Sequence, residues 1–248
     1  KIFLNLKNEQ TIEVIKQLCK RRGINCHNLL EQNSSFKEIH GRISIKNFFF
    51  TIIALFKEII TNWSFRGIGL KNWKSSKAKL LFTSYLVNFD SNSNSKDKLN
   101  NNYWNHLIKL LEKEKIKTNW LNLYLKNDSL DFGIQATKKL NEININSKNQ
   151  THVCLFTFLN STIVIRTLID WFGIINTLRK VSFSEKIFLI KDSKLNIWPL
   201  LKDDWESSFQ GKDLVINILR FHLFESCLRL LQTQEKGFFL QENIPLEY

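Results

Sequence analysis

The chain has 248 residues, of which 43% are hydrophobic and 24% are charged, and its formal net charge is +13. This composition is typical of a globular protein with a core of ordinary size, and it excludes an intrinsically disordered chain. No stretch reaches the roughly 20 consecutive apolar residues of a membrane-spanning helix. The four cysteines lie far apart in the sequence, which favours reduced thiols in a cytoplasmic protein over a disulfide framework.

The positive charge is compatible with three partners: nucleic acid, an anionic membrane surface, or an anionic substrate such as a nucleotide-activated sugar. A general enrichment in Lys, Asn, Ile and Phe explains it without any dedicated partner. The sequence contains no run of five Lys or Arg residues and no basic–aromatic recognition motif. Nucleic-acid binding is therefore the weakest of the three hypotheses, and we expect none.

Residues 1–31 predict one β-α-β step, in which Gly23 ends an amphipathic helix between two short strands. Residues 32–78 predict a polar connection that leads into an apolar helix over 48–63. This helix is interpreted either as a buried helix that covers a sheet or as an interfacial helix on an anionic membrane. The basic residues that would face lipid headgroups are Lys46, Lys57, Arg66, Lys71, Lys74 and Lys77.

From residue 79 to residue 248, strand-like and helix-like patterns alternate. Strands are expected over 80–87, 118–125, 152–159 and 238–240, and helices over 103–115, 132–144, 161–180 and 212–231. The alternation predicts an α/β fold with a Rossmann-like, mostly parallel sheet and helices on both faces. We expect residues 1–248 to form a single α/β domain. Because the sequence has no methionine and begins and ends within strand patterns, we also expect a fragment that lacks a second domain beyond residue 248.

The strong catalytic motifs are absent from the sequence. It contains no G-x-G-x-x-G or Walker A phosphate loop, no G-x-S-x-G nucleophile elbow and no H-E-x-x-H zinc motif. The spacing of Cys19, Cys26 and His27 matches no zinc site. The pair Asp203–Asp204 is interpreted as the solvated face of a helix. We therefore predict no metal and no cofactor.

Polar residues at the ends of the predicted strands are the candidate site. Gln241, Glu242 and Asn243 follow the last strand, where amides and a carboxylate can hydrogen-bond sugar hydroxyls and Glu242 can act as a general base. Glu247 belongs to the same segment. The alternative is a capping turn with Asn243 as the N-cap of a helix.

A second group lies around a polar loop, residues 88–105, at the edge where α/β sheets bind ligands. Tyr103 and Trp104 can stack on a sugar, or can act as a staple at the start of a helix. His106 is a weak acid–base candidate. Asn119 is interpreted either as a hydrogen-bonded structural asparagine or as a contact to substrate, next to a core Trp120.

Three stretches of the sequence resemble a known protein family: YWNHLIKLLEKEKIKTNWLNLYL, LNIWPLLKDDWESSFQG and EKGFFLQENIPLEY. Over residues 62–248 the chain resembles a bacterial family of surface carbohydrate biosynthesis proteins found in O-antigen loci. It departs from that family's pattern at two places. In the family a Gly-Pro pair follows Tyr-Trp, where this chain has Asn105–His106. In the family a Trp precedes the final Glu, where this chain has Leu246.

The resemblance implies a glycosyltransferase-like protein of lipopolysaccharide O-antigen biosynthesis with the two-Rossmann-domain (GT-B) architecture. This fragment would contribute the acceptor-side domain, and the missing half would hold most of the nucleotide-activated sugar. The implied acceptor is a lipid-linked saccharide, and the implied location is cytoplasmic, at the inner face of the membrane. The alternative from the residues is a non-catalytic module that binds carbohydrate or protein.

Overall fold

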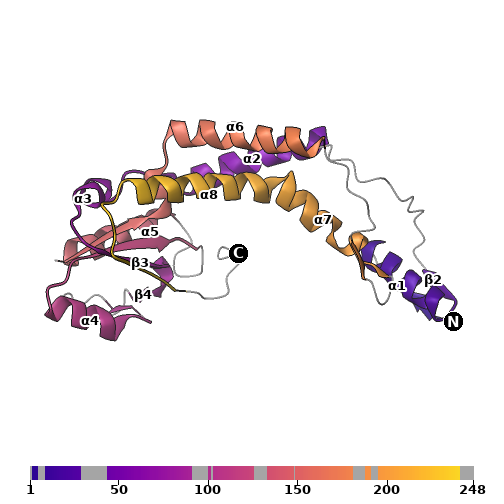
Figure 1. Ribbon diagram of the computed structural model, residues 1–248, viewed down its shortest axis with the longest axis horizontal. Helices are drawn as coiled ribbons and strands as arrows, with labels where there is room; N and C mark the ends of the chain where they lie inside the picture. Colours follow the sequence, from indigo (N-terminus) through magenta and orange to yellow (C-terminus); the bar gives the residue numbers. More distant parts are fainter. Residues whose placement is uncertain are drawn as a thin grey trace. The chain divides into compact units, whose positions relative to one another are not determined.

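The computed structural model describes residues 2–4, 9–28, 44–90, 100–101, 103–125, 133–147, 149–180, 188–190 and 195–240 (Figure 1). The chain divides into two compact units. Unit 1 comprises Lys1–Ala54 and Leu168–Ile216, and unit 2 comprises Leu55–Thr167 and Asn217–Tyr248. The predicted segment Gln241–Glu247 lies outside the described residues.

Unit 2 contains a four-stranded sheet in the order β10-β3-β6-β7, and every pair of neighbours is parallel. Its strands are β3 (Leu80–Tyr85), β6 (Thr118–Leu123), β7 (Gln150–Cys154) and β10 (Lys236–Phe239). Between successive strands lie α4 (Asn105–Lys113) and α5 (Gly133–Asn146). The predicted α/β, Rossmann-like fold with a parallel sheet is therefore confirmed.

Helices lie on both sides of this sheet. Figure 1 shows α4 on one side and α8 (Lys212–Arg229) on the other. The chain runs from β3 to β6 to β7 in one direction and then returns to place β10 on the far side of β3. Two short strands, β4 (Phe89–Asp90) and β5 (Asn100–Asn101), form an antiparallel pair between β3 and α4.

One row of rings crosses all four strands at a single register. Phe238, Phe82, Trp120 and His152 are direct partners on β10, β3, β6 and β7. Their ring centroids are separated by 4.8, 4.5 and 5.6 Å in that order, and consecutive rings are within 14° of parallel. A slip of one residue in any strand would turn its ring to the opposite face and interrupt the row, which we call the cross-strand stack.

The prediction for β7 was wrong in length, because the strand ends at Cys154 and residues Leu155–Phe158 form a short 3-10 helix. Thr157 causes this ending. Its hydroxyl accepts the N–H of Cys154 at 3.2 Å and donates to the carbonyl of Ile68 at 3.0 Å. The apolar run continues unchanged through this turn, so the pattern of hydrophobic residues does not reveal where the strand stops.

The segment that leads into β3 packs tightly on β7 at one glycine. Gly69, which precedes α3 (Leu70–Ser75), has a positive φ of 71°, and a Cβ at this position would lie 2.7 Å from the carbonyl oxygen of His152. Both the backbone conformation and the close approach therefore require glycine.

Unit 1 contains the β-α-β step predicted for residues 1–31. Strands β1 (Ile2–Leu4) and β2 (Cys26–Asn28) pair in parallel on either side of α1 (Glu9–Arg21). A hairpin of β8 (Leu189–Ile190) and β9 (Leu195–Asn196) precedes α7 (Trp198–Phe209). Residues 45–54 of α2 (Ile45–Thr61) and 168–178 of α6 (Ser161–Leu178) complete the unit.

The α2–α6 contact in unit 1 is organised around one tryptophan. Trp171 of α6 is fully buried, stacks on Phe48 of α2 with centroids 5.4 Å apart, and donates its indole N–H to the carbonyl of Gln210 at 3.2 Å. In the described part of the chain, none of the helices combines the length and the apolar character needed to cross a bilayer.

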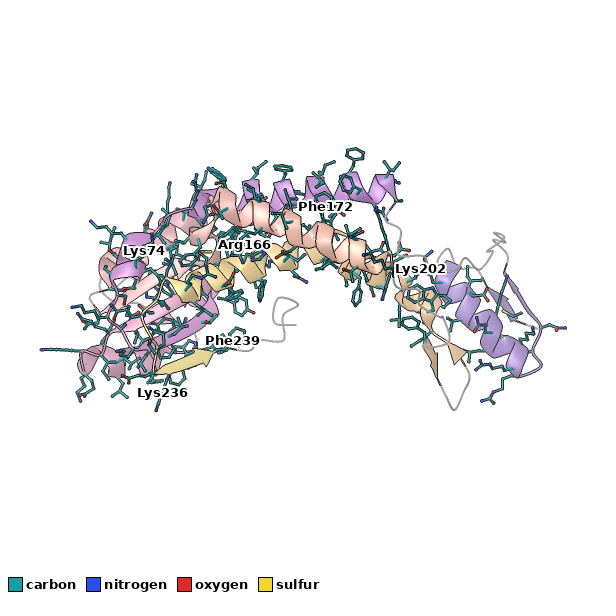
Figure 2. The ribbon with its side chains drawn as sticks, turned by 45° about the horizontal axis from the view of Figure 1, so that its top comes forward. Lys74, Arg166, Phe172, Lys202, Lys236 and Phe239 are labelled. Carbon is teal, nitrogen blue, oxygen red and sulfur yellow. The ribbon has the colours of Figure 1, made fainter. Side chains whose placement is uncertain are left out.

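The cross-strand stack predicts a large difference between two ring deletions in unit 2. Trp120→Ala should lower the free energy of unfolding by about 3–5 kcal/mol, because a fully buried ring between two stacked neighbours is lost. Phe239→Ala, which removes an exposed ring of β10 (labelled in Figure 2), should cost less than about 1 kcal/mol. Urea unfolding of both variants measures the difference, and equal losses would show that the stack does not hold the sheet together.

His152 predicts an acid-dependent loss of stability. Burial lowers the pKa of His152 from 6.5 to about 3, so between these values the unfolded chain binds a proton that the folded chain does not. Stability should therefore fall as the pH drops below 6.5, by about 2 kcal/mol between pH 7 and pH 5. His152→Phe keeps a ring in the stack. It should reduce the slope of the unfolding free energy against pH by the equivalent of about one bound proton. An unchanged slope in that variant would show that His152 does not cause the acid-dependent loss of stability.

Candidate functional site

The candidate site lies at the carboxyl edge of the four-stranded sheet. In open α/β sheets, ligands bind outside the carboxyl ends of the strands, at the point where the strand order reverses. Here the reversal falls between β3 and β10. The N–H of Leu240, the residue after β10, donates to the carbonyl of Thr83 in β3 at 3.1 Å. The strands β3 and β10, which precede the predicted residues 103–106 and 241–247 in the sequence, are therefore neighbours up to their carboxyl ends.

Gln241, Glu242, Asn243 and Glu247 lie outside the described residues. Their roles in binding and general-base catalysis stay predictions.

Asn101 positions the Tyr103–Trp104 pair. Its side-chain oxygen accepts the backbone N–H groups of Tyr103 and Trp104, both at 3.0 Å, immediately before α4 begins. The Trp104 ring then packs edge-on against Phe82 of the cross-strand stack, with centroids 5.7 Å apart. Tyr103 is 60% exposed. The two side chains therefore have different surroundings: Trp104 packs against the sheet, and Tyr103 faces solvent.

Several buried polar atoms at this corner of unit 2 have no hydrogen-bond partner within the described part of the chain. They are Ser84 Oγ, Asn122 Oδ1, Asn101 Nδ2, Trp104 Nε1 and Asn105 Oδ1. We call these five residues the polar cluster.

Register and one ring contact place three members of the polar cluster on one face of the sheet. Ser84 and Asn122 are direct partners on β3 and β6. Each follows a ring of the cross-strand stack by two residues, so both side chains lie on the face that carries Phe82 and Trp120. Trp104 packs on that same face through Phe82.

The hydrogen bonds of the two amides show which of their atoms remain without a partner. Asn122 Nδ2 donates to the carbonyl of Val153 at 3.0 Å, which leaves its oxygen as an acceptor. Asn101 uses its oxygen for two backbone N–H groups, which leaves its nitrogen as a donor. The polar cluster thus contains both donors and acceptors, and none of them carries a charge.

Such atoms are costly in a folded protein. A buried polar atom without a hydrogen bond destabilises the fold by about 1–3 kcal/mol. Native structures satisfy most of these atoms with protein groups, ordered water or a ligand. Ordered water, or a small neutral molecule that supplies hydroxyl groups, would therefore complete the hydrogen bonds of the polar cluster.

The other predicted residues do not join the polar cluster. His106 lies exposed on the first turn of α4. Asn119 is fully buried at the opposite, amino edge of the sheet. It accepts the Ser76 hydroxyl at 2.6 Å and donates to Gln234 Oε1 at 3.2 Å. It therefore joins β6 to the segments that enter β3 and β10, as expected of a structural asparagine.

A second hollow at the carboxyl edge was not anticipated from the sequence. A cavity of about 180 Å³ follows the ends of β6 and β7, and an ion pair of 3.1 Å between Arg220 and Glu58 lies in its wall. The other residues around it are Thr61, Asn62, Leu123, Tyr124, Leu125, Leu155 and Phe156. The two charged residues are 162 positions apart in the chain, and no local pattern connects them.

Ser84 and Asn122 were also missed, although a signal was present. Both are polar residues inside strands that are otherwise largely apolar. Asn122 lies three positions after Asn119 on the same strand, nearer the carboxyl end. Among the described residues, no group of three or more His, Cys, Asp or Glu side chains is arranged to hold a metal ion.

Comparison with known proteins identifies no relative: no family profile, no curated protein and no solved structure matches this chain. The chemistry of the site must therefore be argued from its own residues.

The absence of a partner for Ser84 predicts an unusual response to mutation. Ser84→Ala should leave the free energy of unfolding unchanged or raise it by about 1 kcal/mol, because it removes a buried hydroxyl that has no hydrogen bond to any described residue. Ser76→Ala is the matched control and should lose about 1–2 kcal/mol, because its hydroxyl is bonded to Asn119. Thermal and urea unfolding measure both variants. A loss at Ser84 as large as that at Ser76 would mean that the Ser84 hydroxyl has a partner in the free protein.

Proposed function

We propose that this chain is a glycosyltransferase-like protein of surface-polysaccharide assembly, and that unit 2 binds the saccharide acceptor at the polar cluster. The observation that carries the proposal is the set of buried, uncharged donors and acceptors at the carboxyl edge of the sheet that have no partner among the described residues. A sugar hydroxyl both donates and accepts a hydrogen bond, so it can satisfy such a mixed set. No Lys or Arg belongs to the polar cluster, which disfavours a phosphate or a carboxylate as the bound group.

Aromatic residues support the same interpretation. Tyr103 is exposed immediately beside Trp104, and an exposed aromatic ring can pack against the apolar face of a sugar while its hydroxyl stays in water. Binding sites for small ligands commonly combine such apolar contacts with a few well-placed polar groups. The switch point between β3 and β10 is also the usual ligand position in this fold class.

The remaining parts of the proposal follow from the resemblance. Glu242 would be the general base, with Gln241, Asn243 and Glu247 as hydrogen-bonding partners of the saccharide. A second domain would hold the nucleotide-activated sugar, which would require no further cofactor. Support for including residues 241–247 comes from their chain position, directly after the strand that pairs with β3.

Two variants test the saccharide site by binding. Trp104→Phe removes the indole N–H and keeps an aromatic ring against Phe82, so the affinity for saccharide should fall about 3- to 10-fold. Tyr103→Ala should weaken binding by a similar factor, about 3- to 10-fold, through the lost stacking surface. Saturation-transfer NMR and calorimetry with glucose, galactose, mannose and N-acetylglucosamine provide the measurement. Trp63→Phe, an exposed tryptophan outside the polar cluster, is the control and should bind as the wild type does.

Turnover separates an enzyme from a binding module. The full-length protein, given nucleotide sugars and a lipid-linked saccharide, should release nucleoside diphosphate, and Glu242→Gln should lower kcat. Saccharide binding without any transfer would identify a non-catalytic carbohydrate-binding module. If none of the sugars binds to the wild-type chain, the proposal is wrong.

A further inference from the structure

Unit 1 has an apolar face that its own core does not use. Ile45, Phe49 and Ile53 follow one another at four-residue intervals along α2, and Ile169 and Phe172 lie on α6. Their exposed fractions range from 49% to 78%. We call these five residues the apolar face.

The two helices share this surface through Phe48. Its ring centroid lies 5.7 Å from that of Phe49 and 6.0 Å from that of Phe172, which is labelled in Figure 2. A groove of about 480 Å³ opens beside these rings, and it is lined by Phe48, Phe172, Gly173, Ile175, Asn176 and Arg179. The rings of Phe48, Phe49 and Phe172 and the groove beside them therefore form one hollowed, apolar surface.

Other side chains of the same two helices are buried within unit 1. Thr51 of α2 and Trp171 of α6 point into the unit and are almost completely buried. The apolar helix predicted over 48–63 had two interpretations, buried or interfacial. The part of α2 in unit 1 has one buried side and one exposed apolar side. Contiguous exposed apolar surface of this kind usually marks a docking site.

Charge indicates what docks there. Lys46 is exposed next to Ile45, Arg179 lines the groove, and the chain as a whole has a formal net charge of +13. A second copy of this chain would bring the same positive charge to the interface and would be repelled. An anionic surface would be attracted, and the attraction would add to the burial of the apolar side chains.

We propose that the apolar face of unit 1 docks on an anionic lipid bilayer. The Phe and Ile side chains enter the boundary between headgroups and acyl chains, where aromatic residues of interfacial helices commonly lie. Lys46 and Arg179 stay at the level of the lipid phosphates. The interaction is peripheral and reversible, and it does not depend on the saccharide proposal, which concerns unit 2.

Vesicle co-sedimentation of the full chain tests the proposal. The wild type should bind vesicles of phosphatidylcholine with phosphatidylglycerol better than vesicles of phosphatidylcholine alone, and added salt should weaken the binding. The double variant Phe49→Ser with Ile53→Ser should bind about tenfold more weakly. Ile134→Ser with Ile145→Ser is the matched control, because it removes two exposed apolar residues from α5 and should bind as the wild type does.

A second variant separates the charge contribution from the apolar one. Lys46→Glu with Arg179→Glu should abolish the preference for phosphatidylglycerol while circular dichroism stays unchanged. The proposal is overturned if the wild type does not bind anionic vesicles, or if the Phe49–Ile53 variant binds as well as the wild type. It is also overturned if light scattering finds a stable dimer that the same variant dissociates, because the face would then join two copies.

Discussion

The architecture of unit 2 depends on the cross-strand stack. Four rings, one from each strand, fix the register of the whole sheet at a single level, and the positions on either side of that level follow from it. Ser84 lies beside Asn122 because Phe82 lies beside Trp120. The end of β10 meets the end of β3 because Phe238 also stacks on Phe82. One set of contacts therefore positions the core and the candidate site together.

This arrangement places a structural cost at the point where function is proposed. The rings of the cross-strand stack are stabilised by burial and stacking. At the next level of the sheet, the Ser84 hydroxyl and the Asn122 amide oxygen have no hydrogen-bond partner within the part of the chain that the structure describes. Proteins tolerate such unfavourable groups where a ligand or water completes them. The fully bonded network at Asn119, on the opposite edge, shows that the same sheet satisfies its polar groups where no ligand is expected.

The two units present different kinds of surface. The candidate site of unit 2 is polar and uncharged, and it suits a molecule with many hydroxyl groups. The apolar face of unit 1, with cations beside it, suits an anionic bilayer. A transferase that extends a lipid-linked saccharide would use both kinds of surface, because its acceptor has a sugar part and a membrane part. The two proposals stand on separate residues and separate observations.

The sequence by itself determined the elements and the fold class. Periodicity and breakers predicted most helices and strands of the described chain, and their alternation predicted the parallel sheet, because these signals are local. Only the tertiary structure decided the strand order, the end of β7 at Cys154, and the pairing of Ser84 with Asn122. Each of these depends on contacts between residues far apart in the chain. The strand order depends on the pairing of β10 with β3, and the end of β7 depends on the hydroxyl of Thr157 bonded to Ile68. The pairing of Ser84 with Asn122 depends on a register fixed by stacked rings. A polar residue in a strand becomes a candidate site only when its neighbours on adjacent strands are known, and that information is not local.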